Sequence, residues 1–184
     1  MNLIMQKIGM KIGINLDKFV YDFKFFDWIK KSKLVELEKV NCKDDPVRPE
    51  LDNEFRITHG RKIFGLKYKD SIEAVVCLAF TNDIPTTVKE LELMCKDASL
   101  VASHRADPPE VGTIAVAYTL WSYKKGAGKK IMKELQKYVK KIHHLNTIVT
   151  LSPLTPVATH YHISNGAKLI QMNPITQNFE YKLK

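Results

Sequence analysis

Between two strongly periodic segments the chain carries the stretch Ser122-Tyr123-Lys124-Lys125-Gly126-Ala127-Gly128-Lys129-Lys130. An apolar run from Gly112 to Trp121 precedes it and predicts a buried strand. After it, apolar residues recur at helical spacing, at Ile131, Leu135, Tyr138 and Ile142, with Met132 and Val139 beside them. Thr147 to Leu151 then returns as a strand. The sequence therefore predicts a strand, loop, helix, strand crossover at the centre of a mixed α/β fold.

The rest of the chain supplies further helices and strands. We expect an amphipathic helix from Leu16 to Leu37 and a turn-rich connection from Asn41 to Leu51. The remaining patterns predict strands at Phe55–His59 and Ile63–Tyr68, a central strand within Ile72–Phe80, a short helix at Val88–Cys95, and a closing hairpin of Lys168–Met172 with Phe179–Leu183. We divide the chain into an N-terminal helical segment (1–50), packed on one α/β domain (51–184).

Composition narrows the classes of partner. The 184-residue chain is 45% hydrophobic, which suits one domain with a core, and its formal net charge is +9. Lysines interleave with acids and form no nucleic-acid motif, so a phosphate-rich small ligand is preferred over nucleic acid or a membrane surface. Three cysteines without paired spacing argue against disulfides and zinc, and favour the cytoplasm. Homo-oligomerisation stays open.

The basic stretch has the chemistry of a diphosphate site. The first N–H groups of a helix lack intrahelical partners, and its macrodipole attracts anions. Gly126 and Gly128 allow close approach of a phosphate, and four lysines surround them. The alternative is an ordinary glycine turn before a solvated, lysine-rich helix. The loop resembles the pyrophosphate loop of the GNAT acetyltransferases, a Gln or Arg, two residues, Gly, one residue, then Gly or Ala; here Tyr123 takes the first position.

A hydroxyl and an imidazole follow at a spacing of ten residues. Ser152 lies where a strand stops at Pro153, so its side chain is expected at the sheet edge, within reach of His162. Two alternatives remain: Ser152 only ends its strand, or His160, on the same side of an extended segment, replaces His162. The pair His143-His144 is expected to cap a helix C-terminus rather than to bind metal.

A second resemblance covers about Phe55 to Tyr181. This part is similar to the catalytic domain of malonyl-CoA decarboxylase, which is of GNAT type. The resemblance lies in Phe55-Arg56-Ile57-Thr58-His59, Leu151-Ser152-Pro153 and His162-Ile163-Ser164-Asn165-Gly166-Ala167. It implies a GNAT-like mixed sheet flanked by helices and assigns catalysis to Ser152 and His162. The implied substrate is a coenzyme A thioester, and the contacts are assigned to Tyr118, Thr119, Leu120, Ser122, Lys124, Lys125, Gly126, Ala127, Gly128, Lys129 and Asn165.

The chemistry leaves three functions to compare. Loss of CO2 from a malonyl thioester leaves an enolate that must be stabilised and protonated, without a metal, and an imidazole titrating near neutral pH can supply the proton. This decarboxylation is our preferred function. The alternatives are an N-acetyltransferase, in which His162, Glu110 or a water-linked group deprotonates an amine, and a non-catalytic acyl-CoA-binding module.

Overall fold

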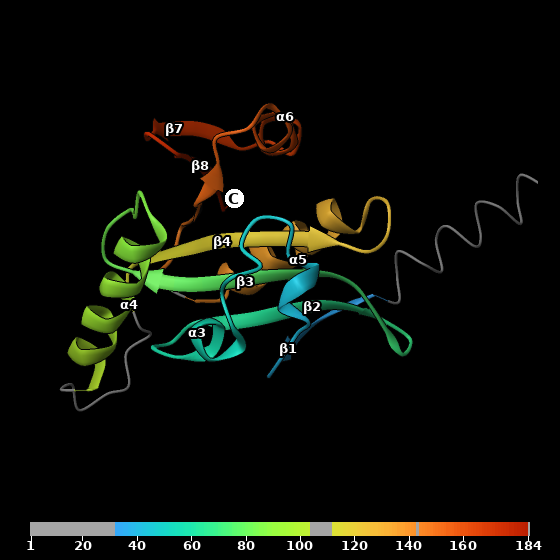
Figure 1. The fold of residues 1–184 in the computed structure, drawn as a ribbon, viewed down its shortest axis with the longest axis horizontal. Coiled ribbons are helices and arrows are strands. Elements are labelled where there is room, and N and C mark those ends of the chain that lie inside the picture. Colours follow the sequence, from blue (N-terminus) through green and yellow to red (C-terminus); the bar gives the residue numbers. More distant parts are fainter. Residues whose placement is uncertain (1–31, 104–111, 143, 184) are drawn as a thin grey trace, which may run out of the picture.

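The computed structural model describes residues 32–103, 112–142 and 144–183. These residues form an eight-stranded mixed sheet in the order β1-β2-β3-β4-β5-β8-β6, with β7 on β8 (Figure 1). The strands are β1 (Lys33–Leu37), β2 (Lys62–Tyr68), β3 (Ser71–Thr81), β4 (Ile114–Ser122), β5 (Thr147–Thr150), β6 (Ser152–Pro153), β7 (Lys168–Met172) and β8 (Thr176–Lys182). The helices are η1 (Cys42–Asp44), α3 (Asn53–Ile57), α4 (Val88–Ser103), α5 (Ala127–Val139) and α6 (Pro156–Ser164).

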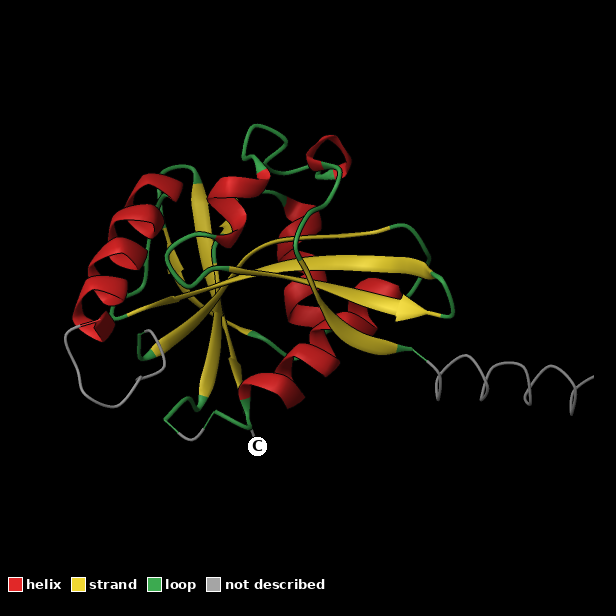
Figure 2. Cartoon of the chain, turned by 90° about the horizontal axis from the view of Figure 1, so that it is seen from below, coloured by secondary structure: helices red, strands yellow, loops and turns green. Residues whose placement is uncertain are grey.

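Helices cover both faces of the sheet (Figure 2). On one face α5 buries Ile131, Met132, Leu135 and Val139 against β2, β3 and β4. On the other face, Leu91 and Cys95 of α4 and Phe55 of α3 pack against the opposite side chains of the same strands. The long apolar runs of β3 and β4 follow from this two-sided burial, because neither face of these strands meets water.

The central crossover is confirmed. Strand β4 and strand β5 run parallel, joined by α5, while the other strand pairs are antiparallel. The register between them ends at Ala117 and Thr150. Beyond that point β4 continues to Ser122, whereas the chain after β5 turns to β6 and pairs with β8. The two parallel strands therefore separate and leave a crevice between their C-terminal ends.

Two predictions in the N-terminal third are wrong. The helix expected through Leu37 is a strand over Lys33–Leu37, because this segment pairs residue by residue with Ile63–Lys67 of β2 at the sheet edge. Its residues 16–31 lie outside the described part, and the division at residue 50 stays a prediction. The strand expected at Phe55–His59 is instead helix α3, whose first turn is capped where Asp52 accepts the Phe55 N–H at 2.7 Å.

The C-terminal third is partly as predicted. The hairpin is confirmed as β7 and β8, although β8 begins already at Thr176. The segment around His160, expected to be extended, is helix α6. Thr155 caps it by accepting the Ala158 N–H at 3.3 Å, and Pro156 occupies its first turn. Pro156 thus begins the helix, since Pro is favoured in the first turn, whereas Pro153 lies in β6 and pairs with Thr176 of β8.

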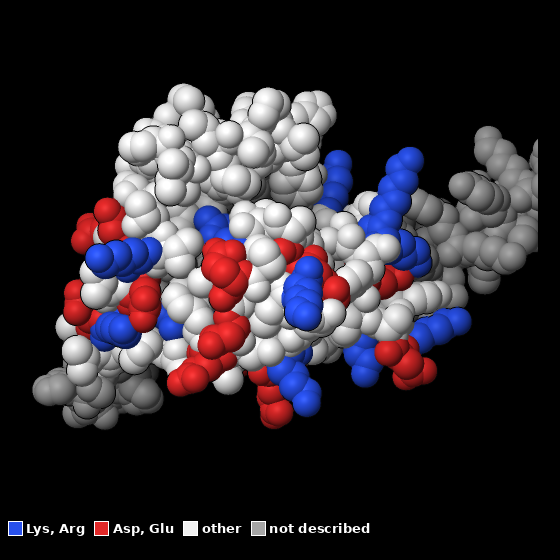
Figure 3. Space-filling view, viewed as in Figure 1, with Lys and Arg blue, Asp and Glu red and all other residues white. Residues whose placement is uncertain are grey.

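Charge is unevenly distributed on the surface. Figure 3 shows mainly uncharged side chains over α6 and β7, where Val157, Met172 and Ile175 are well exposed. Charged side chains gather over α4 and the β1–β3 side of the same view. None of the helices in the described ranges combines the length and hydrophobicity needed to cross a bilayer.

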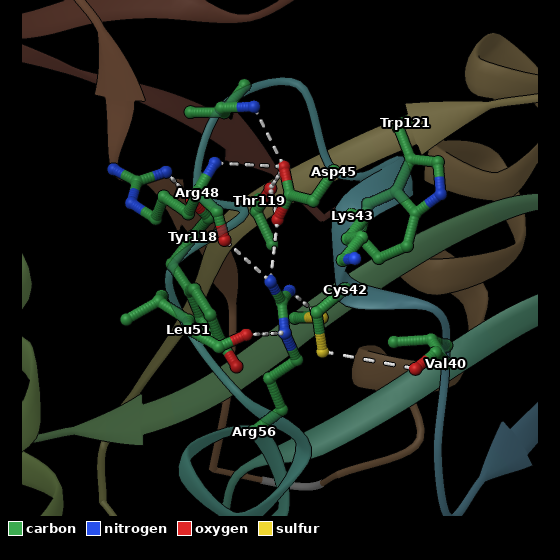
Figure 4. Close-up of polar contacts among 12 residues, drawn as sticks. Val40, Cys42, Lys43, Asp45, Arg48, Leu51, Arg56, Tyr118, Thr119 and Trp121 are labelled. Carbon is green, nitrogen blue, oxygen red and sulfur yellow. Dashed lines mark hydrogen bonds and ion pairs between the residues drawn. The ribbon is translucent and has the colours of Figure 1, made fainter.

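A buried ion pair fixes the connection expected at Asn41–Leu51 onto the sheet (Figure 4). Arg56 of α3 donates to Asp45 at 2.9 Å, and both side chains are fully buried. Asp45 also accepts the Thr119 hydroxyl of β4 at 2.8 Å and the backbone N–H groups of Val47 and Arg48. Because every oxygen of Asp45 is engaged, the loop has one defined path across the end of β4.

Replacing Arg56 by methionine tests this anchor. R56M leaves the Asp45 carboxylate buried without its cation, so we expect the free energy of unfolding to fall by about 3–5 kcal/mol. K62M is the matched control, because Lys62 pairs with Glu36 at 3.0 Å on the surface and its loss costs under about 1 kcal/mol. Urea denaturation measures both variants, and equal effects would contradict the anchoring role.

Candidate active site

The crevice between β4 and β5 holds a cavity of about 310 Å³. Its walls come from the ends of β4 and β5, from β6, from the first turn of α5, from α6 and from the loop residues 46–48. The lining is mainly apolar, and Arg48 is the one charged side chain among the described residues that line it, with His162 neutral. A concave apolar site with few polar groups is typical of small-ligand binding.

Ser152 and His162 meet inside this cavity. The Ser152 Oγ lies 2.7 Å from His162 Nε2, and both residues are buried. On the far side of the imidazole, Nδ1 lies 2.9 Å from the Tyr181 hydroxyl. Ser152 Oγ also donates to Thr150 Oγ1 at 3.2 Å. With Tyr181 donating to Nδ1, Nε2–H donates to Ser152, and one continuous chain of hydrogen bonds runs from β8 to the cavity.

Aromatic contacts hold the imidazole in this orientation. Phe179 stacks on the His162 ring with centroids 4.7 Å apart, and Tyr161 packs edge-on at 5.1 Å. Phe179 and Tyr181 lie two residues apart on one face of β8, and they contact the face of the ring and its Nδ1. The sheet itself therefore sets the position of the helix side chain. The pair is therefore preorganised in the absence of any ligand.

Burial determines the charge of His162. Desolvation lowers the pKa of His162 from 6.5 to about 4, so the imidazole is neutral at physiological pH. The expectation of a histidine titrating near neutral pH is therefore wrong. A neutral imidazole can accept a proton at one nitrogen and donate one from the other, and it carries no positive charge.

Helix α6 separates the two candidate histidines. His162 points into the cavity, whereas His160 is exposed and lies 3.4 Å from Ser164 Oγ. Two positions along an α-helix differ by about 200° in direction, which places these side chains on opposite sides. The alternative pairing of Ser152 with His160 does not occur. His144 lies after α5, with Nε2 2.9 Å from Gly112 O, and His143 is outside the described residues.

The basic loop opens α5 beside the cavity. Gly126 is the N-cap residue, with φ 82°, a conformation that favours glycine. Gly128 and Ala127 are buried, and Tyr161 donates to Gly128 O at 2.8 Å, which ties the loop to α6. Lys125 and Lys129 are exposed there. Lys124 forms an ion pair with Glu73 at 2.6 Å, so part of its charge is neutralised within the protein.

The candidate residues of β4 face different ways. A bulge at Tyr118, opposite Cys77 and Leu78, places Tyr118 and Thr119 toward the α3 side. Tyr118 is buried against Phe55, with its hydroxyl inside the core. Leu120 packs toward α5, and Ser122 is exposed at the strand end. All four line the cavity with some of their atoms.

Asn165 lies apart from these residues. It caps the C-terminus of α6, where its Nδ2 donates to Tyr161 O at 2.7 Å. Together with Gly166 it borders a separate hollow beside α5 and Tyr181. The structure therefore gives Asn165 a role in shaping the turn after the helix. Within the described ranges, no three His, Cys, Asp or Glu side chains converge as metal ligands would.

Arg48 and Tyr181 also contribute to the site, although no sequence pattern predicts either of them. Arg48 donates to Tyr118 O of β4 and, at 2.9 Å, to Leu151 O beyond β5, so its guanidinium spans the point where these strands separate. The pattern Asp-Asp-Pro-Val-Arg-Pro predicts only a turn. A single arginine in a loop between prolines belongs to no helical or strand periodicity, so its sequence context does not mark it as a site residue. Tyr181 lies in a segment that predicts an ordinary strand.

Comparisons with solved structures agree with this architecture. The GphF GNAT-like decarboxylase in complex with isobutyryl-CoA matches with a TM-score of 0.61 at 9% identity, covering 83% of this chain and 100% of that chain. The loading GNATL domain of CurA from Lyngbya majuscula matches with a TM-score of 0.57 at 13% identity, covering 84% and 98%. The chain has a GNAT fold. No protein-family model matches it, and no curated sequence does.

An acetyltransferase shares the same architecture. The Bacillus subtilis acetyltransferase in complex with CoA matches with a TM-score of 0.55 at 13% identity, covering 84% of this chain and 100% of that chain. The expected fold class, a GNAT-like mixed sheet flanked by helices, is thereby confirmed. At these identities the likeness concerns the GNAT fold, which hosts more than one reaction, so function must be argued from the site.

The buried imidazole predicts a pH dependence of stability. The folded pKa of His162 lies below that of the unfolded chain, so the unfolded state binds the proton first as the pH falls. Stability is complete above about pH 6.5, and about 3 kcal/mol is lost by pH 4. H162Q should remove this part of the pH dependence of the unfolding free energy, measured by urea denaturation at each pH. H160Q, at an exposed position, should keep it; identical slopes for both variants would contradict the assignment.

Proposed function

We propose that the protein is an acyl-CoA enzyme that decarboxylates malonyl-CoA, or a related short acyl-CoA, to the shorter thioester. The observation that supports this most directly is the Ser152–His162 hydrogen bond of 2.7 Å inside an apolar crevice. Decarboxylation needs a closed pocket, donors for an enolate and one proton, and it needs no second substrate. The crevice supplies the hydrogen-bonded donors Ser152 and His162 in a mainly apolar lining.

The diphosphate of coenzyme A is assigned to the loop at the start of α5. There the positive end of the helix, the exposed Lys125 and Lys129 and the left-handed Gly126 form an anion-binding surface. The open edge of β4 beyond Ala117 leads from this loop toward Ser152. A pantetheine arm along that edge brings the thioester to the Ser152–His162 pair.

The hydrogen-bond chain provides the proton. As the bond between the carboxylate and the α-carbon breaks, CO2 leaves and the electron pair forms the thioester enolate. Ser152 O–H then protonates that carbon, Nε2–H of His162 passes to the serine oxygen, and Tyr181 O–H passes to Nδ1, so the imidazole stays neutral with its proton moved from Nε2 to Nδ1. A proton from solvent then neutralises the Tyr181 oxygen, and return of the imidazole proton from Nδ1 to Nε2 resets the relay. The net reaction consumes one proton and yields acetyl-CoA and CO2.

N-acetyl transfer is the second candidate. It is favoured by the structural likeness to an acetyltransferase in complex with CoA, which has the same fold. A cationic amine acceptor needs carboxylates to attract it, and among the described lining residues there is neither Asp nor Glu. Glu110, the alternative base, lies outside the described residues. A third candidate, an acyl-CoA-binding module, predicts CoA binding without turnover.

Incubation with malonyl-CoA in the absence of any amine separates these functions. We expect acetyl-CoA to form faster than in a control without protein, as measured by mass spectrometry. S152A and H162F should each lower the rate about 100-fold or more, because they break the proton relay. H160A and S164A are the matched controls on the same helix and should retain the rate. Intact malonyl-CoA alongside CoA binding would refute decarboxylation, and acetyl-CoA with amines would be tested next.

The loop assignment has its own test. G126A places a side chain at a φ of 82°, which costs about 1 kcal/mol and displaces the backbone at the start of α5. We expect weaker CoA binding by isothermal titration calorimetry. G166A imposes the same conformational penalty at φ 86°, at the end of α6, and serves as control. Equal losses of CoA affinity in both variants would remove the loop from the binding site.

A further inference from the structure

We propose that Arg48 is the carboxylate-binding residue of the crevice, so that the protein selects CoA derivatives whose acyl group ends in a free carboxylate. The inference rests on the proposed acyl-CoA binding, but not on decarboxylation. It specifies the substrate class, acyl-CoA derivatives with a negatively charged acyl end, and the residue that binds this charge.

The buried charges around Arg48 do not balance. Asp45, Arg48 and Arg56 are at most 5% exposed, and they form one cluster with one negative and two positive charges. Asp45 is paired with Arg56 at 2.9 Å, and its oxygens also accept Thr119 and two backbone N–H groups. Asp45 and, less strongly, the exposed Glu50 act on Arg48 electrostatically, but among the described residues neither carboxylate is hydrogen-bonded to its guanidinium. Arg48 is thus a buried cation without a carboxylate partner in the described structure.

The Arg48 guanidinium also has N–H donors that are not hydrogen-bonded within the described residues. An arginine side chain carries five N–H donors. Two of its nitrogens donate, to Tyr118 O and to Leu151 O, and both acceptors are neutral carbonyls. Among the described residues nothing accepts the other three N–H groups. A buried guanidinium of this kind is stabilised most by a carboxylate, which it binds through two parallel hydrogen bonds.

The position of Arg48 fits a ligand rather than the protein interior alone. It lines the same cavity as Ser152 and His162, and Leu151, whose carbonyl it binds, directly precedes Ser152. The remaining described walls carry no ionised side chain. A thioester that enters from the α5 loop therefore meets one fixed positive charge beyond the reacting atoms. In water such a charge would be screened, whereas in an apolar cavity it discriminates between charged and neutral acyl groups.

An inert pair of ligands tests this inference. S-(2-carboxyethyl)-CoA and S-(2-carbamoylethyl)-CoA have nearly the same shape, and neither can lose CO2. We expect the wild-type protein to bind the acid about tenfold more tightly than the amide in calorimetric titration. R48M should bring this ratio close to 1 while the affinity for the amide changes little. R61M, which removes a buried arginine bonded to Phe55 O outside the cavity, should keep the ratio.

A second measurement tests the inference on the wild-type protein, in case R48M does not fold. The chain has four arginines, so ¹⁵N-arginine NMR of the wild-type protein can follow each Nε–H signal. The acid should shift the Arg48 signal more than the amide does, with R61M aiding the assignment. The inference would be overturned if the wild-type protein bound acid and amide with equal affinity, or if R48M lowered the affinity for both by the same factor. Arg48 would then be a structural residue.

The two proposals fail in different ways. If the acid is preferred through Arg48 but malonyl-CoA stays intact, the carboxylate selectivity holds and decarboxylation is refuted. If malonyl-CoA is decarboxylated while acid and amide bind alike, the reaction holds and the role of Arg48 is refuted.

Discussion

The separation of β4 from β5 is the constraint on which the site depends. Two parallel strands that part leave backbone carbonyls without partners, which is costly in a buried region. Arg48 satisfies Tyr118 O on one strand and Leu151 O beyond the other, so the opening is bridged by a side chain instead of being closed by a ladder. The same guanidinium gives the opening a positive charge. Arg48 therefore both holds the crevice open and supplies its charge.

The loop that carries Asp45 and Arg48 is in turn fixed by residues remote from the crevice. Arg56 of α3 binds Asp45 and also donates to Arg48 O at 2.8 Å, so a short helix on the sheet face fixes the backbone from which Arg48 extends. On the other wall, Phe179 and Tyr181 of β8 orient His162. Both sides of the site are supported by buried contacts, which limits the motion of the polar groups before a ligand arrives.

The sequence predicted those parts of the molecule whose residues repeat with a clear period. The strand Ile114–Ser122, the face of α5 and the pairing of β7 with β8 follow from local patterns. Lys33–Leu37 has no local pattern that separates it from the preceding helical spacing, because its edge position depends on pairing with Ile63–Lys67 of β2. Phe55 and His160 lie in helices and not in extended segments, because Asp52 and Thr155 cap helices just before them.

Whether the sequence predicts a polar contact of the site depends on how far apart its two residues lie along the chain. Ser152 and His162 lie ten residues apart, so a turn and one short helix suffice to bring them together, and spacing alone predicted a pair. Arg48 reaches Leu151 across 103 residues, a contact that no local pattern encodes. Burial also changes the chemistry expected of His162, since an imidazole enclosed by Phe179 and Tyr161 has a lowered pKa and loses its charge. A neutral imidazole beside the Arg48 cation is therefore a property of the folded crevice, and among the described lining residues the permanent charge lies on a guanidinium, which stays protonated.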